Sequence, residues 1–111
     1  MNFLLANTLL TNSKKENYHK LANNTYLARD GAGNICVYLH RTPIITLHPD
    51  GSSTLDSGGY RTATTKERFG LIPCHVYQDK FDWYIGNNGK PVAFFDGARV
   101  DSLGRVLNTP S

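Results

Sequence analysis

The chain has 111 residues, of which 40% are hydrophobic and 19% charged, and its formal net charge is +3. This composition is ordinary for a globular protein and excludes wholesale disorder, so we expect one β-rich domain over residues 1–111. The longest apolar stretches are only a few residues, such as Ile44 to Leu47, which excludes a spanning helix of about 20 apolar residues. The mild positive charge permits acidic partners without requiring them.

Residues 1–20 are expected to form an N-terminal arm or short helix followed by a polar loop. The apolar side chains of the first ten residues follow no strict alternation, so the type of this element stays open. The start of the chain lacks the basic segment of a signal peptide and is interpreted as mature structure. The segment from Thr11 to Lys20 is rich in Asn and Lys and is typical of a surface loop.

The chain has two cysteines, Cys36 and Cys74, and their spacing matches no metal or redox motif. Without a secretory segment, free buried thiols in a reducing compartment are favoured over a disulfide. We therefore expect the protein in the cytoplasm.

Short β-branched and aromatic runs then alternate with turn residues. Thr25 to Arg29 and Ile35 to His40 flank a Gly-rich turn, which predicts a hairpin. Ile44 to Leu47 and Ser53 to Asp56 flank His48-Pro49-Asp50-Gly51, whose Pro and Gly positions suit a type I turn. Pro43 marks a turn or the start of a strand, because proline cannot donate to a central ladder.

A break at Ser57-Gly58-Gly59 precedes one predicted short helix near residues 64–69, since Thr64 and Glu67 have the spacing of a capping box. Strands are then expected at 75–78, 82–85 and 92–95, with a turn at Asn87-Asn88-Gly89, and further turns flank 98–100. The pattern predicts a mainly β fold, an antiparallel meander that forms a small barrel or sandwich.

Motifs for metal binding and catalysis are weak. His40, His48, Asp50 and Asp56 cluster around one hairpin, but their spacing fits no ligand signature, so we expect no metal. The chain also lacks a nucleophile elbow, a P-loop and a dinucleotide fingerprint. We therefore expect a non-catalytic protein without a cofactor.

Tyrosines and arginines are interleaved along the chain, which is a pattern of β-domains that bind single-stranded nucleic acid. Aromatic residues at alternating positions are equally ordinary cross-strand partners. A nucleic-acid-binding β-domain is therefore the alternative function.

The segment from residue 57 to residue 68 concentrates glycines, hydroxyls and cations, and it is the candidate site for a ligand or partner. Its candidate residues are Ser57, Gly58, Gly59, Tyr60, Arg61, Thr64, Thr65, Lys66 and Arg68. Together they predict a site for an anionic group on a small ligand or a partner protein. The other interpretation is a structural corner that the glycines turn and Thr64 caps.

Several segments resemble small uncharacterised proteins that recur in tailed-bacteriophage genomes. The segments that carry the resemblance are Asn24 to Leu27, Leu39 to Thr46, Asp50-Gly51, and Ser57 to Lys66 with Arg68. The most specific part is Ser-Gly-Gly-aromatic-Arg-Thr ending in Thr-Thr-Lys, where Tyr60 stands in place of the usual Trp.

The resemblance implies a phage accessory protein that acts in the cytoplasm of a bacterial host cell. There it is expected to engage or inhibit a host component, such as a host protein or a small anionic ligand, with defence systems among the targets. The further alternatives are a minor virion component and a small enzyme. The predicted fold also permits self-association into a homo-oligomer, because exposed edge strands can pair.

Overall fold

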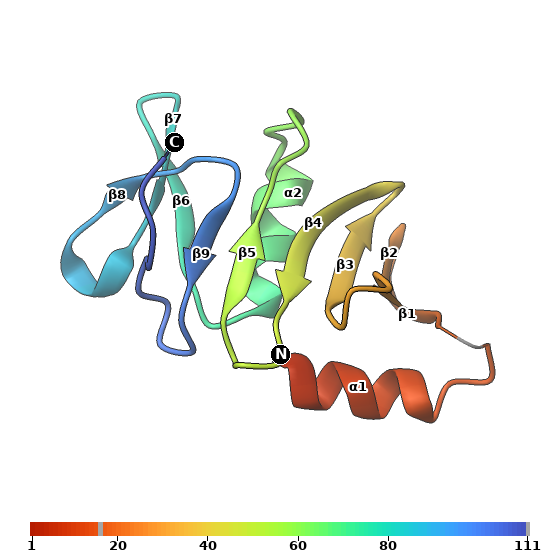
Figure 1. Ribbon diagram of the computed structural model, residues 1–111. Coiled ribbons are helices and arrows are strands. Elements are labelled where there is room, and N and C mark those ends of the chain that lie inside the picture. Colours follow the sequence, from red (N-terminus) through yellow and green to blue (C-terminus); the bar gives the residue numbers. More distant parts are fainter. Residues whose placement is uncertain (16, 111) are drawn as a thin grey trace.

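The computed structural model describes residues 1–15 and 17–110, which form two antiparallel sheets and two α-helices around one core (Figure 1). The larger sheet has the order β1 (His19–Ala22), β2 (Thr25–Arg29), β3 (Ile35–Leu39), β4 (Thr42–Leu47), β5 (Ser53–Leu55) and β9 (Ala98–Val100). The smaller sheet has the order β6 (Val76–Asp79), β7 (Asp82–Ile85) and β8 (Val92–Ala93). The helices are α1 (Phe3–Thr11) and α2 (Ala63–Arg68), with 3-10 turns η1 (Phe69–Leu71) and η2 (Asn87–Gly89).

The mainly β, antiparallel fold is confirmed. Strands β2 to β5 form the predicted meander, because each pairs with the next one along the chain. Strand β1 extends it and was not predicted: the expected polar loop ends earlier, because His19–Ala22 pairs with β2. The strands are divided between two sheets with a common core, as the sandwich alternative expected. The short helix near residues 64–69 is also present, displaced by one residue to Ala63–Arg68.

Turn chemistry sets the ends of the strands. The amide of Gly51 donates to the carbonyl of His48 at 3.0 Å, with Gly51 at φ 93°, as the predicted turn requires. Strand β3 ends at Leu39 because His40 has φ 57°, outside the β region. Pro43 lies in β4, opposite Tyr38 of β3. The pairing of the two strands shifts register next to Tyr38, and this irregularity accommodates the N–H donor that proline lacks.

The N-terminal arm is a helix. Asn2 caps α1 by accepting a hydrogen bond from the amide of Leu5 at 2.9 Å. Ala6 and Leu10 are buried against the larger sheet, whereas Leu4 is 75% exposed. The absence of a clear apolar alternation in this segment is thus explained by a helix that contacts the core along one narrow stripe.

The helix α2 is capped by Thr62 and not by Thr64. The Thr62 hydroxyl accepts a hydrogen bond from the amide of Thr65 at 3.2 Å and lies 3.1 Å from the Thr65 hydroxyl. Thr65 is almost completely buried. The helix begins at Ala63, which places the Thr65 side chain in the protein interior. Tertiary packing therefore selects the earlier of two competent caps.

Three aromatic side chains join the two sheets. Phe69 is fully buried, and its ring contacts those of Trp83, at a centroid distance of 6.5 Å, and Phe94, at 5.5 Å. The rings of Trp83 and Phe94 also contact each other, at 5.6 Å. These residues come from η1, from β7 and from the segment after β8. They fix α2 and the smaller sheet against the rest of the core.

Both cysteines are free, as predicted. Burial raises the pKa of the Cys74 thiol to about 11, so this thiol is protonated at neutral pH. No helix within the described part of the chain is long and apolar enough to cross a membrane.

Candidate functional site

The first part of the predicted segment forms a tight corner between β5 and α2. The Ser57 amide and hydroxyl both donate to the Asp96 carboxylate, at 2.7 Å and 2.8 Å. A Cβ on Gly58 would lie 2.4 Å from the Thr42 methyl carbon, and Gly58 and Gly59 both have positive φ. Ser57 and the two glycines therefore have a structural role in placing the residues that follow.

The next three residues present their side chains to different surroundings. Tyr60 and Thr62 line a cavity, whereas the guanidinium of Arg61 lies over the rings of Trp83 and Phe94. The corner thus separates the predicted segment into two surfaces. We call them the β3–β4 pocket and the cation platform.

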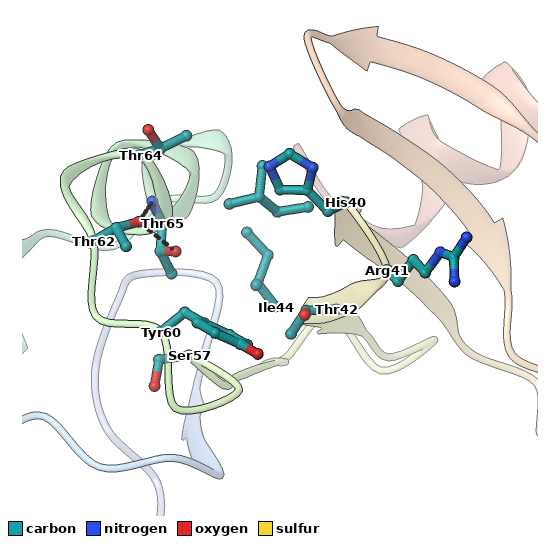
Figure 2. Close-up of a pocket in the computed structure, with 10 residues that line it drawn as sticks. His40, Arg41, Thr42, Ile44, Ser57, Tyr60, Thr62, Thr64 and Thr65 are labelled. Atoms are coloured by element: carbon teal, nitrogen blue, oxygen red, sulfur yellow. Dashed lines mark hydrogen bonds between the residues drawn. The ribbon is translucent and has the colours of Figure 1, made fainter.

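The β3–β4 pocket is a cavity of about 640 Å³ between the β3–β4 turn and the segment that leads into α2 (Figure 2). Its lining residues are Leu39, His40, Arg41, Thr42, Ile44, Ser57, Tyr60, Thr62, Thr64 and Thr65. Leu39 and Ile44 are buried and give it an apolar floor, while hydroxyls, His40 and Arg41 surround that floor. None of these residues is acidic.

Figure 2 shows how the side chains of the pocket are oriented. The ring of Tyr60 lies between Ser57 and Thr42, and the guanidinium of Arg41 extends away from the centre. Tyr60 is 67% exposed, so one large aromatic side chain is freely accessible at the edge of the cavity. This arrangement suits a ligand group that is apolar at its centre and acidic at its margin.

The cation platform consists of Arg61, Lys66, Trp83 and Phe94. The Arg61 guanidinium carbon lies 5.1 Å from the Phe94 ring centroid and 6.0 Å from that of Trp83. The Lys66 ammonium lies 5.9 Å from the Trp83 centroid and donates to the Gln78 side chain at 3.4 Å. No ion pair joins either cation to an acidic residue of the described chain.

The third predicted cation lies elsewhere. Arg68 donates through Nε to the buried hydroxyl of Thr25 at 2.9 Å and contacts the Glu67 carboxylate at 3.4 Å. Its side chain thus connects α2 to β2 and is already partnered. The structure places Arg61 and Lys66 over the same ring, Trp83, and directs Arg68 to β2 instead.

The other members of the predicted site line the pocket. Thr64 and Thr65 belong to it, but the amide of Thr65 is already bonded to the Thr62 cap. His40, Arg41 and Thr42 were missed as site residues. A signal for them existed in the sequence, because all three fall within one of the segments that carry the phage resemblance.

The His and Asp cluster around the β4–β5 turn has a structural explanation. The His48 ring nitrogens contact the Asn34 side-chain oxygen at 3.1 Å and the Thr54 hydroxyl at 2.7 Å. Two effects lower the pKa of His48: partial burial is the larger, and the positive charge of Arg99 is the second. Among the described residues, no group of three or more potential ligand side chains could hold a metal ion.

The surface tyrosines stack mainly on one another. The ring of Tyr26 lies between those of Tyr18 and Tyr38, at centroid distances of 5.0 Å and 5.1 Å. A second stack joins His75, Tyr77 and Tyr84 on the smaller sheet. The middle rings of both stacks have their faces occupied within the protein, which is the cross-strand use of aromatics.

The antiparallel sheets define a small mainly β protein, and the pocket and the cation platform are its candidate sites. Comparison with protein families then gives its origin. The family model described as Kyanoviridae Gp96 protein matches residues 5–101, which is most of the chain. The chain belongs to this family and is a bacteriophage protein, as the resemblance implied. No curated protein and no solved structure matches it.

Proposed function

We propose that this phage protein is a non-catalytic binding protein that engages or inhibits a host component in the bacterial cytoplasm, with host defence machinery among its targets. The cation platform is the part of its surface that recognises the target. The recognised group is anionic and belongs to a host protein or to a small ligand.

One observation carries this proposal: two cations, Arg61 and Lys66, both lie over the ring of Trp83 without an acidic partner among the described residues. The Trp83 centroid is 6.0 Å from the Arg61 guanidinium and 5.9 Å from the Lys66 ammonium. Neither positive charge is neutralised by an acidic side chain of the described residues, so an anionic group that binds here gains Coulomb attraction from both. The ring faces hold both cations in place before binding, which lowers the entropic cost of ordering them.

The stacked tyrosines favour a protein or small ligand over single-stranded nucleic acid as the target. Bases bind to such surfaces by stacking on exposed aromatic faces. The faces of Tyr26 and Tyr77 are covered by neighbouring rings at centroid distances of 5.0 to 5.7 Å. The nucleic-acid alternative is therefore the less favoured one.

The test is quantitative affinity capture from host lysate with the full chain, followed by mass spectrometry of proteins and small molecules. The bait panel is the wild type, Arg61→Ala, Lys66→Ala and a control, Lys90→Ala, which removes an exposed cation from another loop. We expect one component to be captured by the wild type and the control and to be depleted at least fivefold by either platform variant, since hydrogen bonds to charged groups contribute about 1.5 to 3 kcal/mol.

Equal capture by all four baits would contradict the proposal. A gel shift of a single-stranded oligonucleotide that weakens steeply with salt would instead support the nucleic-acid alternative, because counterion release dominates such binding.

A further inference from the structure

The tip of the β6–β7 hairpin carries the most exposed large apolar side chain of the described residues. Phe81 is 93% exposed. Its φ is 73°, and that of the preceding Lys80 is 50°, so both central turn residues occupy the left-handed region that favours Gly and Asn. A bulky aromatic residue at such a position is unfavourable for local structure and for solubility.

The charges beside Phe81 indicate the kind of surface that would accept it. Asp79 and Asp82 face each other across the hairpin, and both are exposed. No ion pair joins either carboxylate to a described cation. Lys80 lies in the same turn, so two carboxylates outnumber one ammonium beside the ring. The tip therefore fits an apolar cavity with a basic margin better than a surface of phosphate groups.

The chain itself has a cavity of that character. The β3–β4 pocket has an apolar floor of Leu39 and Ile44, carries His40 and Arg41, and contains no acidic residue. Its volume of about 640 Å³ is larger than one phenyl ring requires. Because Phe81 is almost fully exposed, it does not fill the pocket of its own chain.

The tip and the pocket lie at the same end of the molecule. In Figure 1 the β6–β7 turn and the green segment before α2 are both at the top, whereas α1 is at the bottom. Arg61, which follows Tyr60 of the pocket, lies over Trp83, two residues after Phe81. Two copies related by a two-fold axis at this end could therefore exchange tips reciprocally.

We propose that the protein self-associates by inserting Phe81 of one copy into the β3–β4 pocket of a second copy. The Asp82 and Asp79 carboxylates of the tip then approach Arg41 at the margin of that pocket. This inference goes beyond the proposed host-binding function, because it uses the pocket and the hairpin tip and does not use the cations of the platform.

The first experiment measures the sedimentation of the full chain over a concentration series. We expect the wild type to show a reversible monomer–dimer equilibrium, and Phe81→Gly to raise its dissociation constant about tenfold or more, as the loss of a central aromatic anchor does. Glycine suits the backbone of this turn, so the variant folds. The control Leu4→Ala, which removes a 75% exposed leucine from α1, is expected to leave the equilibrium unchanged.

The second experiment tests whether the tip enters this particular pocket. Asp82→Arg and Arg41→Asp should each weaken dimerisation, because both contacts of each homodimer then join like charges. An equimolar mixture of the two should restore it, because the mixed dimer has one native and one reversed pair of opposite charges. A wild type that stays monomeric at all concentrations would overturn the proposal. So would an equal effect of Leu4→Ala and Phe81→Gly, or a mixture that fails to restore association.

Discussion

The turn between β6 and β7 contains a residue whose side chain and backbone are in conflict. Phe81 has φ 73°. The left-handed conformation costs a residue with a Cβ roughly 1 to 2 kcal/mol, and glycine avoids this cost. The local sequence offered no sign of this conflict, because Lys-Phe is not a pair that favours a tight turn.

We expect Phe81→Gly to raise the free energy of unfolding by about 1 kcal/mol. Urea unfolding followed by circular dichroism would measure this change. Gln78→Gly, in strand β6 of the same hairpin, is the control and should lower stability, since glycine weakens a regular strand. An unchanged or lower stability of Phe81→Gly would show that the turn is not strained.

His48 is expected to make stability depend on pH. Partial burial, with a smaller contribution from Arg99, lowers its pKa below the ordinary histidine value of 6.5. The unfolded chain therefore binds a proton more readily than the folded chain, and stability falls as the pH decreases through 6.5. Melting midpoints between about pH 7 and pH 5 should decline in the wild type and decline less in His48→Gln.

The exposed His40 supplies the control for that measurement, as His40→Gln. A decline in His48→Gln as steep as in the wild type would assign the pH dependence to other groups. The lowered pKa values of Asp30 and Asp50, caused mainly by hydrogen bonds, affect stability only at lower pH, near the ordinary aspartate value of 3.8.

At the scale of elements, the corner before α2 has two glycines with different surroundings. Gly58 has φ 61° and would place a Cβ 2.4 Å from the Thr42 methyl carbon. Gly59 has φ 83°, and a Cβ at this position would point into open space, with no packed neighbour within 4 Å. The first position therefore needs glycine for both space and conformation, and the second needs it for conformation alone.

We expect Gly59→Ala to cost about 1 kcal/mol, from backbone strain, and Gly58→Ala to cost roughly 2 to 4 kcal/mol, because overpacking adds to that strain. Thermal unfolding of the two matched variants would measure the difference. Equal losses of stability would mean that Thr42 moves aside without cost.

Elements with strong local signals were predictable, and those set by packing were not. Strands β2, β7 and β9 have the predicted bounds because turn residues flank them on both sides. The start of α2 was misplaced because Thr62 and Thr64 are both competent caps, and burial of Thr65 decides between them. Such a choice depends on the core, which a local pattern does not contain.

At the scale of the whole molecule, the candidate site was predictable only in part. Nearness in sequence suggested that Arg61, Lys66 and Arg68 act together. Residues two apart on a helix do not face the same way, and Arg68 accordingly reaches Thr25 on β2. The platform rings, Trp83 and Phe94, come from β7 and from the segment after β8, far from Arg61 and Lys66 in the sequence. Only the tertiary structure therefore assembles the platform.

The central claim is that Arg61 belongs to a binding surface and not to the scaffold. The most direct test is to measure, on one sample of Arg61→Ala, both the affinity for the captured host component and the melting midpoint. We predict an affinity loss of about 1 to 3 kcal/mol, as for hydrogen bonds to charged groups, with a stability loss below about 1 kcal/mol, as for an exposed cation–π contact. Unchanged affinity together with a substantially lower melting midpoint would contradict the account and make this segment a structural corner.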